Sequence, residues 1–232
     1  MEPISNPFQA CKQIILKPNA VFATIKDKQN WSWIPFFLVA LASMLPGLLY
    51  FHTVNFDWYL DLITSSQYGE VSPSEQQTFK NSMSIEQMRY LTIIGSTAGI
   101  AISNAIFAAY LNIFTKGDDM NTRAFADWYG FGWWVSLPTV LAGFVALVFI
   151  LLFGGEQMRP TIINPTSLAF IFNMSMDSPI SKFGQIVRLE SFWSMYLIAV
   201  GLSQWTNLPT SKTYTIAIAP YAIIWTAFLL AG

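Results

Sequence analysis

The sequence predicts an all-α fold, a polytopic membrane helical bundle of five transmembrane helices with N-terminal interfacial helices. Hydrophobic residues make up 53% of the 232 residues, and charged residues only 11%, against about 25% in soluble domains. The charges are absent from five apolar windows, which are residues 33–51, 90–114, 133–153, 192–206 and 214–231. Because backbone groups in lipid must be hydrogen-bonded within the chain, each window is predicted to be a helix.

Two regions are expected, a cytoplasmic amphipathic arm over residues 1–32 and a five-span membrane domain over residues 33–232. The arm is predicted to form two short helices, one after Asn6-Pro7 and one at Pro18, because Asn caps a helix and Pro suits its first position. Such helices either lie on the membrane surface, with lysines reaching lipid phosphates, or pack under the bundle. The sequence leaves both arrangements open.

The first three windows are long enough to span a bilayer, which takes about 20 apolar residues. The last two are short, and local thinning of the bilayer can accommodate a short span. Between the first two windows lies the acidic loop 52–89, which contains Ser72-Pro73-Ser74-Glu75. This motif resembles a capping box and predicts a helix of about 15 residues outside the membrane.

Lys and Arg predict the orientation of the bundle. Four lysines lie on the arm, and five spans place seven basic residues on the side of the arm against five on the other side. Basic residues are enriched on the cytoplasmic side of membranes. The N-terminus is therefore expected in the cytoplasm and the C-terminus outside.

The second window contains the candidate helix-packing or cavity residues. At 100° per residue, Thr97, Asn104 and Asn112 share a stripe with several alanines. We expect this stripe to face the bundle, because small and polar residues are used where membrane helices touch. Asn104 near mid-membrane needs a hydrogen-bond partner, either another helix or a substrate.

Gly95, Gly99 and Ser103 form a second row, on another face of the helix predicted for the second window. Its small-xxx-small spacing suits close contact with another helix or with a second protomer. The motif is common in membrane proteins, so it indicates a homo-oligomer only weakly.

Three prolines interrupt windows and are candidate kinks: Pro46, Pro138 and Pro220. Kinks line cavities or act as hinges in some membrane proteins, although they are routine in membrane helices. No acidic or basic residue lies inside any window. This counts against an ion-coupled pump, which usually needs such residues within its spans.

Composition and motifs also limit the chemistry that is expected. One Cys and one His are too few for a Cys/His zinc site, so no metal or other cofactor is expected. The net charge of −1 provides no basic footprint for nucleic acid. The sequence contains no phosphate-binding glycine loop, zincin helix or nucleophile–base arrangement. We therefore expect no catalytic activity and no catalytic residues.

Three stretches carry a resemblance to a known family. The arm segment NPFQACKQIILKPNAVFATIKD has Asn-Pro, a central Pro18 and Phe22 before the first span. The stretch FADWYGFGWWVSLPTVL contains Tyr129 and Pro138, and the stretch LESFWSMYLIAVGLSQWTNLPTSKTYTIAI begins at Leu189. Together they resemble the YIP family, the Ypt/Rab-interacting multi-pass membrane proteins, over nearly the whole chain.

This resemblance implies a five-span helical domain without catalytic motifs. Eukaryotic members bind lipid-anchored GTPases and each other in vesicle traffic and usually carry a longer cytosolic arm. The short arm is similar to that of bacterial members, which implies a bacterial inner membrane. No binding residue is transferred from the family.

The sequence is compatible with two functions. The first is a membrane scaffold or adaptor that assembles with other membrane proteins, so that its partners are the lipid bilayer, other membrane proteins and a possible second copy. The alternative is a transporter- or channel-like protein for a small or lipidic substrate, which predicts a polar cavity near Asn104 and the proline kinks.

Overall fold

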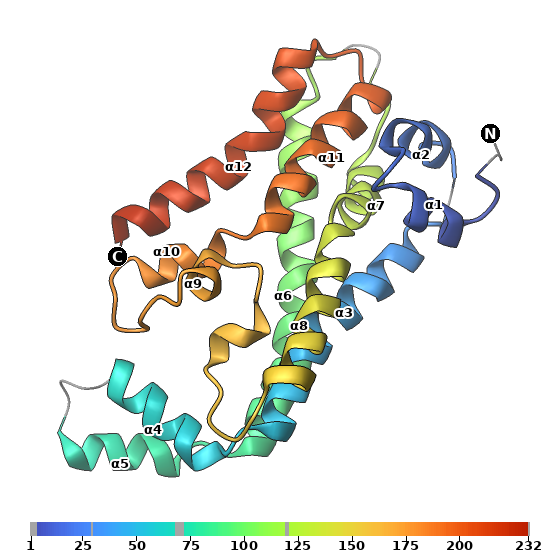
Figure 1. Ribbon diagram of the computed structural model, residues 1–232. Coiled ribbons are helices and arrows are strands. Elements are labelled where there is room, and N and C mark those ends of the chain that lie inside the picture. The colour runs from blue at the N-terminus through green and yellow to red at the C-terminus, as the bar shows by residue number, and fades with distance from the viewer. Residues whose placement is uncertain (1–3, 29, 68–71, 119–120, 232) are drawn as a thin grey trace.

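The computed structural model describes residues 4–28, 30–67, 72–118 and 121–231, and its regular elements there are helices (Figure 1). Four helical segments are long and apolar enough to cross a membrane. They are α3 (Trp33–Thr53), α6 (Ile85–Phe114), the α7–α8 segment (Phe125–Phe153) and α12 (Thr210–Ala231). The predicted fold class, a helical membrane bundle, is therefore confirmed.

The predicted count of five spans is not matched exactly. The helix in the fourth window, α11 (Leu189–Trp205), has 17 residues. At 1.5 Å per residue it extends about 26 Å, short of a hydrocarbon core of roughly 30 Å. It starts part-way along the bundle, beside the short helices α9 (Leu168–Ile171) and α10 (Ser181–Ile186), and ends near the start of α12 (Figure 1). By itself α11 is therefore too short to count as a fifth span.

The three prolines have different effects on their helices. At Pro138 the helix is divided, because α7 (Phe125–Val135) ends just before it and α8 (Pro138–Phe153) begins with it. Pro at the first position of a helix removes no internal hydrogen bond. Pro46 lies inside α3 and Pro220 inside α12, and both helices continue through them.

The two arm helices, α1 (Pro7–Gln13) and α2 (Pro18–Ile25), begin at the predicted prolines. The Asn6 side chain accepts a 2.9 Å hydrogen bond from the Gln9 amide, as expected of a cap. Buried arm residues belong to one core cluster with α7 and α11; they are Ala10, Ile14, Val21, Phe22 and Ile25. Of the two arrangements left open, the arm has the one in which it packs against the bundle.

The opposite end of the bundle is covered by α4 (Phe56–Gln67) and α5 (Pro73–Asn81) (Figure 1). The predicted capping box is present: Ser72 Oγ accepts from the Glu75 amide, and the Ser72 amide donates to Glu75 Oε2 at 3.0 Å. The helix has nine residues rather than about 15. Nearby, the 3₁₀ turn η1 (Pro160–Ile163) packs against α8.

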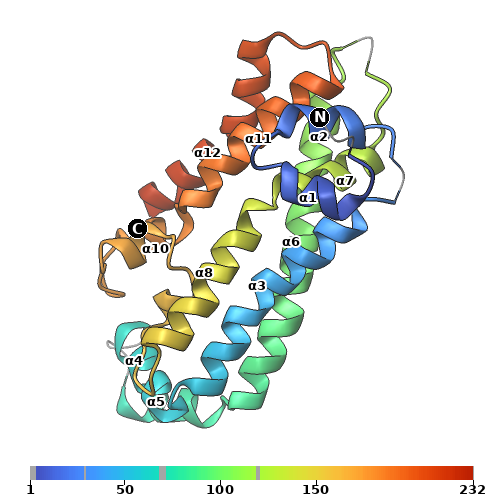
Figure 2. The same cartoon turned by 45° about the vertical axis from the view of Figure 1, so that its right-hand side comes forward.

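The larger cluster of buried hydrophobic residues in the described part of the chain lies at the end that carries the arm. Its largest fully buried side chains include Trp128, Phe131 and Trp134 of α7, which pack with Phe22 of the arm and Leu197 of α11. The pairs α3–α8, α3–α6, α6–α7 and α11–α12 pack side by side (Figure 2). The arm is therefore part of the core that joins α7 to α11.

Candidate functional site

The structure gives Asn104 a partner within the protein. Its Nδ2 donates a 2.8 Å hydrogen bond to the main-chain carbonyl oxygen of Tyr129, and the Asn104 side chain is buried between α6 and α7. A carbonyl oxygen has two lone pairs, so it can accept this bond besides its helical one. The bond is of the helix–helix kind, and Asn104 is absent from the lining of the pocket described below.

Gly132 makes room for this hydrogen bond. A Cβ at residue 132 would overlap Oδ1 of Asn104, so any larger side chain displaces the amide. A similar close approach occurs between α8 and α3, where a Cβ at Gly143 would lie 2.6 Å from the Ala42 carbonyl oxygen. Small residues therefore let these helix pairs approach closely, as membrane helices commonly do.

The other candidate helix-packing or cavity residues on α6 do not form one site with Asn104. Thr97 and Asn112 are half-buried on the same helix. Gly95, Gly99 and Ser103 are exposed, and a Cβ at either glycine would meet no atom within 4 Å. This row therefore lies on the outer surface of α6, open to lipid or to another protein.

The arm contacts the bundle through an aromatic contact at Gly201. The Phe22 ring lies 5.3 Å, centroid to centroid, from the Phe131 ring. A Cβ at Gly201 of α11 would overlap the Phe131 ring and come within 3.0 Å of Phe22. Trp205, one turn further along α11, donates a 3.0 Å hydrogen bond from Nε1 to the Phe22 carbonyl oxygen. The end of α2 is thus held by both packing and a hydrogen bond.

Arg123, just before α7, holds the chain that follows α2. Its guanidinium donates a 2.6 Å hydrogen bond to the Lys26 carbonyl oxygen and lies 3.5 Å from an Asp27 carboxylate oxygen. It also lies over the Trp205 ring, 5.1 Å from the centroid. One cation therefore joins the arm, α7 and α11.

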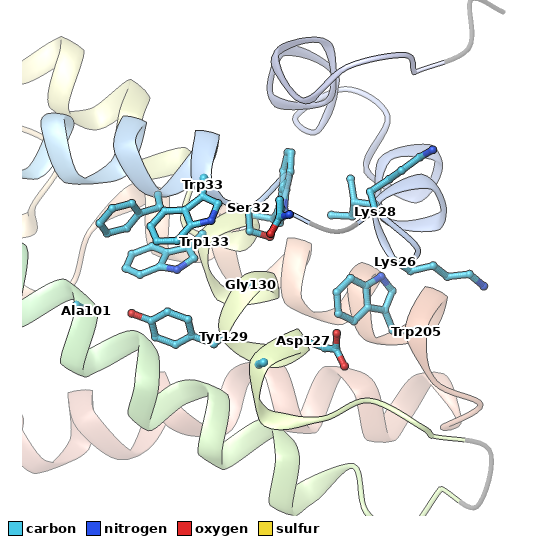
Figure 3. Close-up of a pocket in the computed structure, with 15 residues that line it drawn as sticks. Lys26, Lys28, Ser32, Trp33, Ala101, Asp127, Tyr129, Gly130, Trp133 and Trp205 are labelled. Carbon is cyan, nitrogen blue, oxygen red and sulfur yellow. The ribbon is translucent and has the colours of Figure 1, made fainter.

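A pocket of about 610 Å³ opens beside this junction, and we call it the arm pocket (Figure 3). This volume is typical of small-molecule sites. Its aromatic wall consists of Trp33, Phe36, Tyr129, Trp133, Trp134 and Trp205. Its polar residues are Lys26, Lys28, Asn30, Ser32 and Asp127, and its remaining lining is Ile25, Ala101, Ala126 and Gly130.

One side of the pocket is fixed by two close approaches between α7 and the residues before α3. Trp134 Nε1 donates a 3.1 Å hydrogen bond to Ser32 Oγ, and a Cβ at Gly130 would lie 2.9 Å from the same oxygen. These contacts hold α7 against the chain that enters α3. Asn30, in the connecting segment, has a φ of 64°, a left-handed conformation that Asn tolerates better than most residues.

The charged groups of the arm pocket differ in whether they have a partner within the protein. Asp127 accepts a 2.8 Å hydrogen bond from the Ala124 amide and so caps the start of α7. Lys26 and Lys28 have no carboxylate partner within the described part of the chain. Their ammonium groups point outward, away from the aromatic wall (Figure 3). The ammonium of Lys28 lies over the Trp31 ring, 5.6 Å from its centroid.

Sequence reasoning missed the arm pocket, because it looked for a cavity near Asn104 and the proline kinks. The pocket residues come from the arm and four helices, and no local pattern links them. A signal was nevertheless present: Trp33, Trp133 and Trp205 all stand at edges of apolar windows. Edges that share one side of the membrane place their Trp residues at one level.

Neither a metal site nor a reactive thiol is found in the described residues. They contain no group of three or more His, Cys, Asp or Glu side chains arranged to hold a metal. Burial raises the pKa of the Cys11 thiol, on α1, to about 11. A thiol with a raised pKa is a poor nucleophile at neutral pH, because the reactive form is the thiolate.

Comparison with known proteins gives one family. The Yip1 domain matches residues 12–232, which comprise nearly the whole chain. Neither curated proteins nor solved structures provide a match. The matched range includes the last residues of α1, all of α2, all the long helices and every residue of the arm pocket.

Proposed function

This chain belongs to the Yip1 domain family, and from that premise we propose that it is an integral membrane scaffold or adaptor without catalytic activity. In this role it assembles with other membrane proteins in the bilayer. The arm, the bundle and the outer face of α6 are the parts available for such assembly.

The observation that carries this proposal is the filled interior of the bundle. Trp128, Phe131, Leu197 and Ile198 are each at most 1% exposed, and they pack into a single apolar core with the arm. Asn104, for which either another helix or a substrate was expected as the partner, is hydrogen-bonded to the Tyr129 carbonyl oxygen. A packed apolar core supports a structural role rather than passage of a substrate through this region.

The outer face of α6 is where we propose that a partner helix packs. Only 11% of the residues in the most apolar 18-residue stretch of this 30-residue helix are buried. Gly95 and Gly99 lie on the exposed face with open space around them, which favours close approach of a second backbone. This partner is another membrane protein or a second copy of the chain.

We propose a bacterial inner membrane location with a cytoplasmic N-terminus and an outer C-terminus. The arm, the loop after α6 and the turn after α11 lie at one end of the bundle (Figure 2). Seven basic residues belong to this end: Lys12, Lys17, Lys26, Lys28, Lys116, Arg123 and Lys212. The arrangement supports the positive-inside orientation. Because α12 starts at the end that carries the arm and is long enough to cross a membrane, we propose that the C-terminus lies on the other side of the bilayer.

Photo-crosslinking from α6 tests the scaffold role. A crosslinking amino acid at Gly99, in cells that produce the protein, is expected to form discrete adducts with membrane proteins or with a second copy. The matched control is the same amino acid at Leu151 of α8, which is 70% exposed. Equal, diffuse labelling at both positions would contradict the proposed interface.

The alternative, a transporter- or channel-like protein, has one observation in its favour, the arm pocket. That pocket is large enough for a small ligand, although it lies at the end of the bundle that carries the arm. Reconstituted liposomes distinguish the two functions, because a transporter releases or accumulates solutes at a rate proportional to protein, whereas a scaffold does not.

A further inference from the structure

We propose that the arm pocket binds one anionic phospholipid, with its phosphate at Lys26 and Lys28 and the start of its acyl chains on the aromatic wall. This inference concerns a lipid site that the scaffold role does not require. It therefore stands or falls independently of any protein partner.

The level of the pocket in the membrane supports this ligand. The pocket lies at the first turn of α3, which begins at Trp33, and at the junction of α2 with α11. Trp side chains prefer the headgroup level, where the ring is partly wet. Trp33 is 59% exposed at the pocket mouth, whereas Trp133 is 4% exposed beneath it. The aromatic wall therefore leads from the headgroup level toward the apolar helices.

The charges at the pocket favour an anion. Two lysines and one aspartate line it, and the aspartate is already hydrogen-bonded to the Ala124 amide. Arg123 is occupied by Asp27 and by the Lys26 carbonyl oxygen, so it does not compete for the ligand. The ammonium groups of Lys26 and Lys28 extend outward from the rim (Figure 3). Both side chains are long and flexible and have no carboxylate partner within the described residues, so a phosphate at the rim can draw their ammonium groups toward it without entering the aromatic wall.

The apolar part of the pocket distinguishes a lipid from free phosphate. Trp33, Tyr129 and Trp133 form one side of it (Figure 3), and the Phe36 ring packs against Trp33 and Trp133. The Tyr129 hydroxyl points toward Ala101 of α6, and within the described residues it has no hydrogen-bond partner. An ester group of a glycerolipid offers this hydroxyl an acceptor at the depth where headgroup and chains meet. Inorganic phosphate would leave the apolar wall and this hydroxyl uncovered.

The test is lipid titration of the full-length purified protein, followed by native mass spectrometry. Phosphatidylglycerol is expected to give one retained lipid per chain, and phosphatidylcholine none at the same concentration. In K26Q/K28Q the affinity for phosphatidylglycerol should fall about 25-fold, since each Lys near an anionic lipid is worth roughly a factor of five. The matched control is K12Q/K17Q, on the same arm and outside the pocket, which should change the affinity less than about twofold.

A second pair of variants tests the aromatic wall without disturbing the core. Trp33→Ala is expected to weaken retention at least about fivefold, because a Trp face that contacts the lipid is removed. Phe144→Ala, at an exposed aromatic residue of α8 outside the pocket lining, should leave retention unchanged. Both side chains are more than half exposed, so neither variant compromises folding.

Three results would overturn the proposal. The first is equal loss in K26Q/K28Q and K12Q/K17Q, which would indicate diffuse attraction of the arm to anionic membranes. The second is equal retention of phosphatidylcholine. The third is competition by soluble glycerol phosphate at the concentration of phosphatidylglycerol itself, which would indicate a site for free phosphate.

Discussion

Asn104 on α6 and Gly132 on α7 share one space, because a Cβ at residue 132 would overlap the Asn104 side-chain oxygen. The Asn104 amide nitrogen donates its 2.8 Å hydrogen bond to the Tyr129 carbonyl oxygen, one turn earlier on α7. The glycine and the hydrogen bond thus determine together how closely α6 and α7 approach. Since Tyr129 also lines the arm pocket, this contact positions one wall of the proposed lipid site.

Substitutions at these two positions are expected to be coupled. Asn104→Ala should lower the free energy of unfolding by about 0.6–1.7 kcal/mol, the usual range for a hydrogen bond between membrane helices. Gly132→Ala should cost about 1–3 kcal/mol, because the new methyl group forces Asn104 out of place. In the double variant the shorter side chain at residue 104 leaves room for the methyl group. Its cost should therefore be less than the sum of the two single costs.

Denaturation in mixed micelles measures these differences for each variant. Gly95→Ala is the matched control on α6, because a Cβ there meets open space, so the exchange should stabilise the helix by about 0.5–1 kcal/mol rather than destabilise it. Additive costs at residues 104 and 132 would mean that the two side chains do not compete for space.

Release of the arm is expected when Phe22 is truncated. Phe22 is fully buried between Phe131 and Gly201, and Phe→Ala in a core typically costs about 3–5 kcal/mol. Phe22→Ala should therefore speed tryptic cleavage after Lys26 or Lys28 by about a hundredfold or more, because cleavage follows the population of the open arm. Phe8→Ala, at a residue 59% exposed on α1, is the control. Similar cleavage of both variants would show that Phe22 does not hold the arm.

The pH dependence of the alkylation rate of Cys11, the single cysteine, also reports whether the arm is packed against the bundle. Burial raises the pKa of Cys11 to about 11 from an ordinary 9.0. The thiolate fraction at pH 8 is then about 100-fold lower than for an ordinary thiol. The iodoacetamide rate should keep rising about tenfold per pH unit up to about pH 10, and in Phe22→Ala it should level off near pH 9. The neutral thiol also stabilises the docked arm below pH 9, and this contribution is lost as pH rises through 11. A wild-type rate that levels off near pH 9 would contradict burial of Cys11.

Reporter fusions test the direction of the chain. Alkaline phosphatase fused after Gly232 should be active, and green fluorescent protein at the same position should not fluoresce, if the C-terminus lies outside. The physical reason is that α11 returns the chain to the end that carries the arm before α12 leaves it (Figure 1). A fusion at the turn after Trp205 should give the reverse pattern. A cytoplasmic C-terminus would mean that α11 and α12 do not both cross.

Local rules predicted many elements of the fold correctly. Asn6 and Pro7 start α1, Pro18 starts α2, and Ser72 with Glu75 forms the capping box of α5. Each of these signals depends on residues within one helical turn. Lengths were less predictable: α5 is shorter than expected, and α11 is too short to span alone. Both helices end where neighbouring segments turn the chain, which periodicity does not report.

The candidate site was predicted only in part. Asn104 was singled out because an amide in an apolar helix needs a partner, and the structure provides Tyr129. Gly95 and Gly99 were predicted as a contact row, which stays a prediction, and they are exposed. The residue that accommodates Asn104 is Gly132, on another helix, and no spacing along the chain relates the two. The arm pocket was missed for the same reason.

Charge and apolar length were enough to define the membrane class, the approximate spans and the helix starts, because burial in lipid and helix capping act on each segment separately. The position of the arm could not be obtained in that way. Trp205 donates its hydrogen bond to Phe22 across 183 positions of sequence. Whether the arm lies on the membrane or in the core depends on the shape that α7 and α11 present to it. That shape, with Gly201 making room for two aromatic rings, is what brings Lys26, Lys28 and Trp33 together into one pocket.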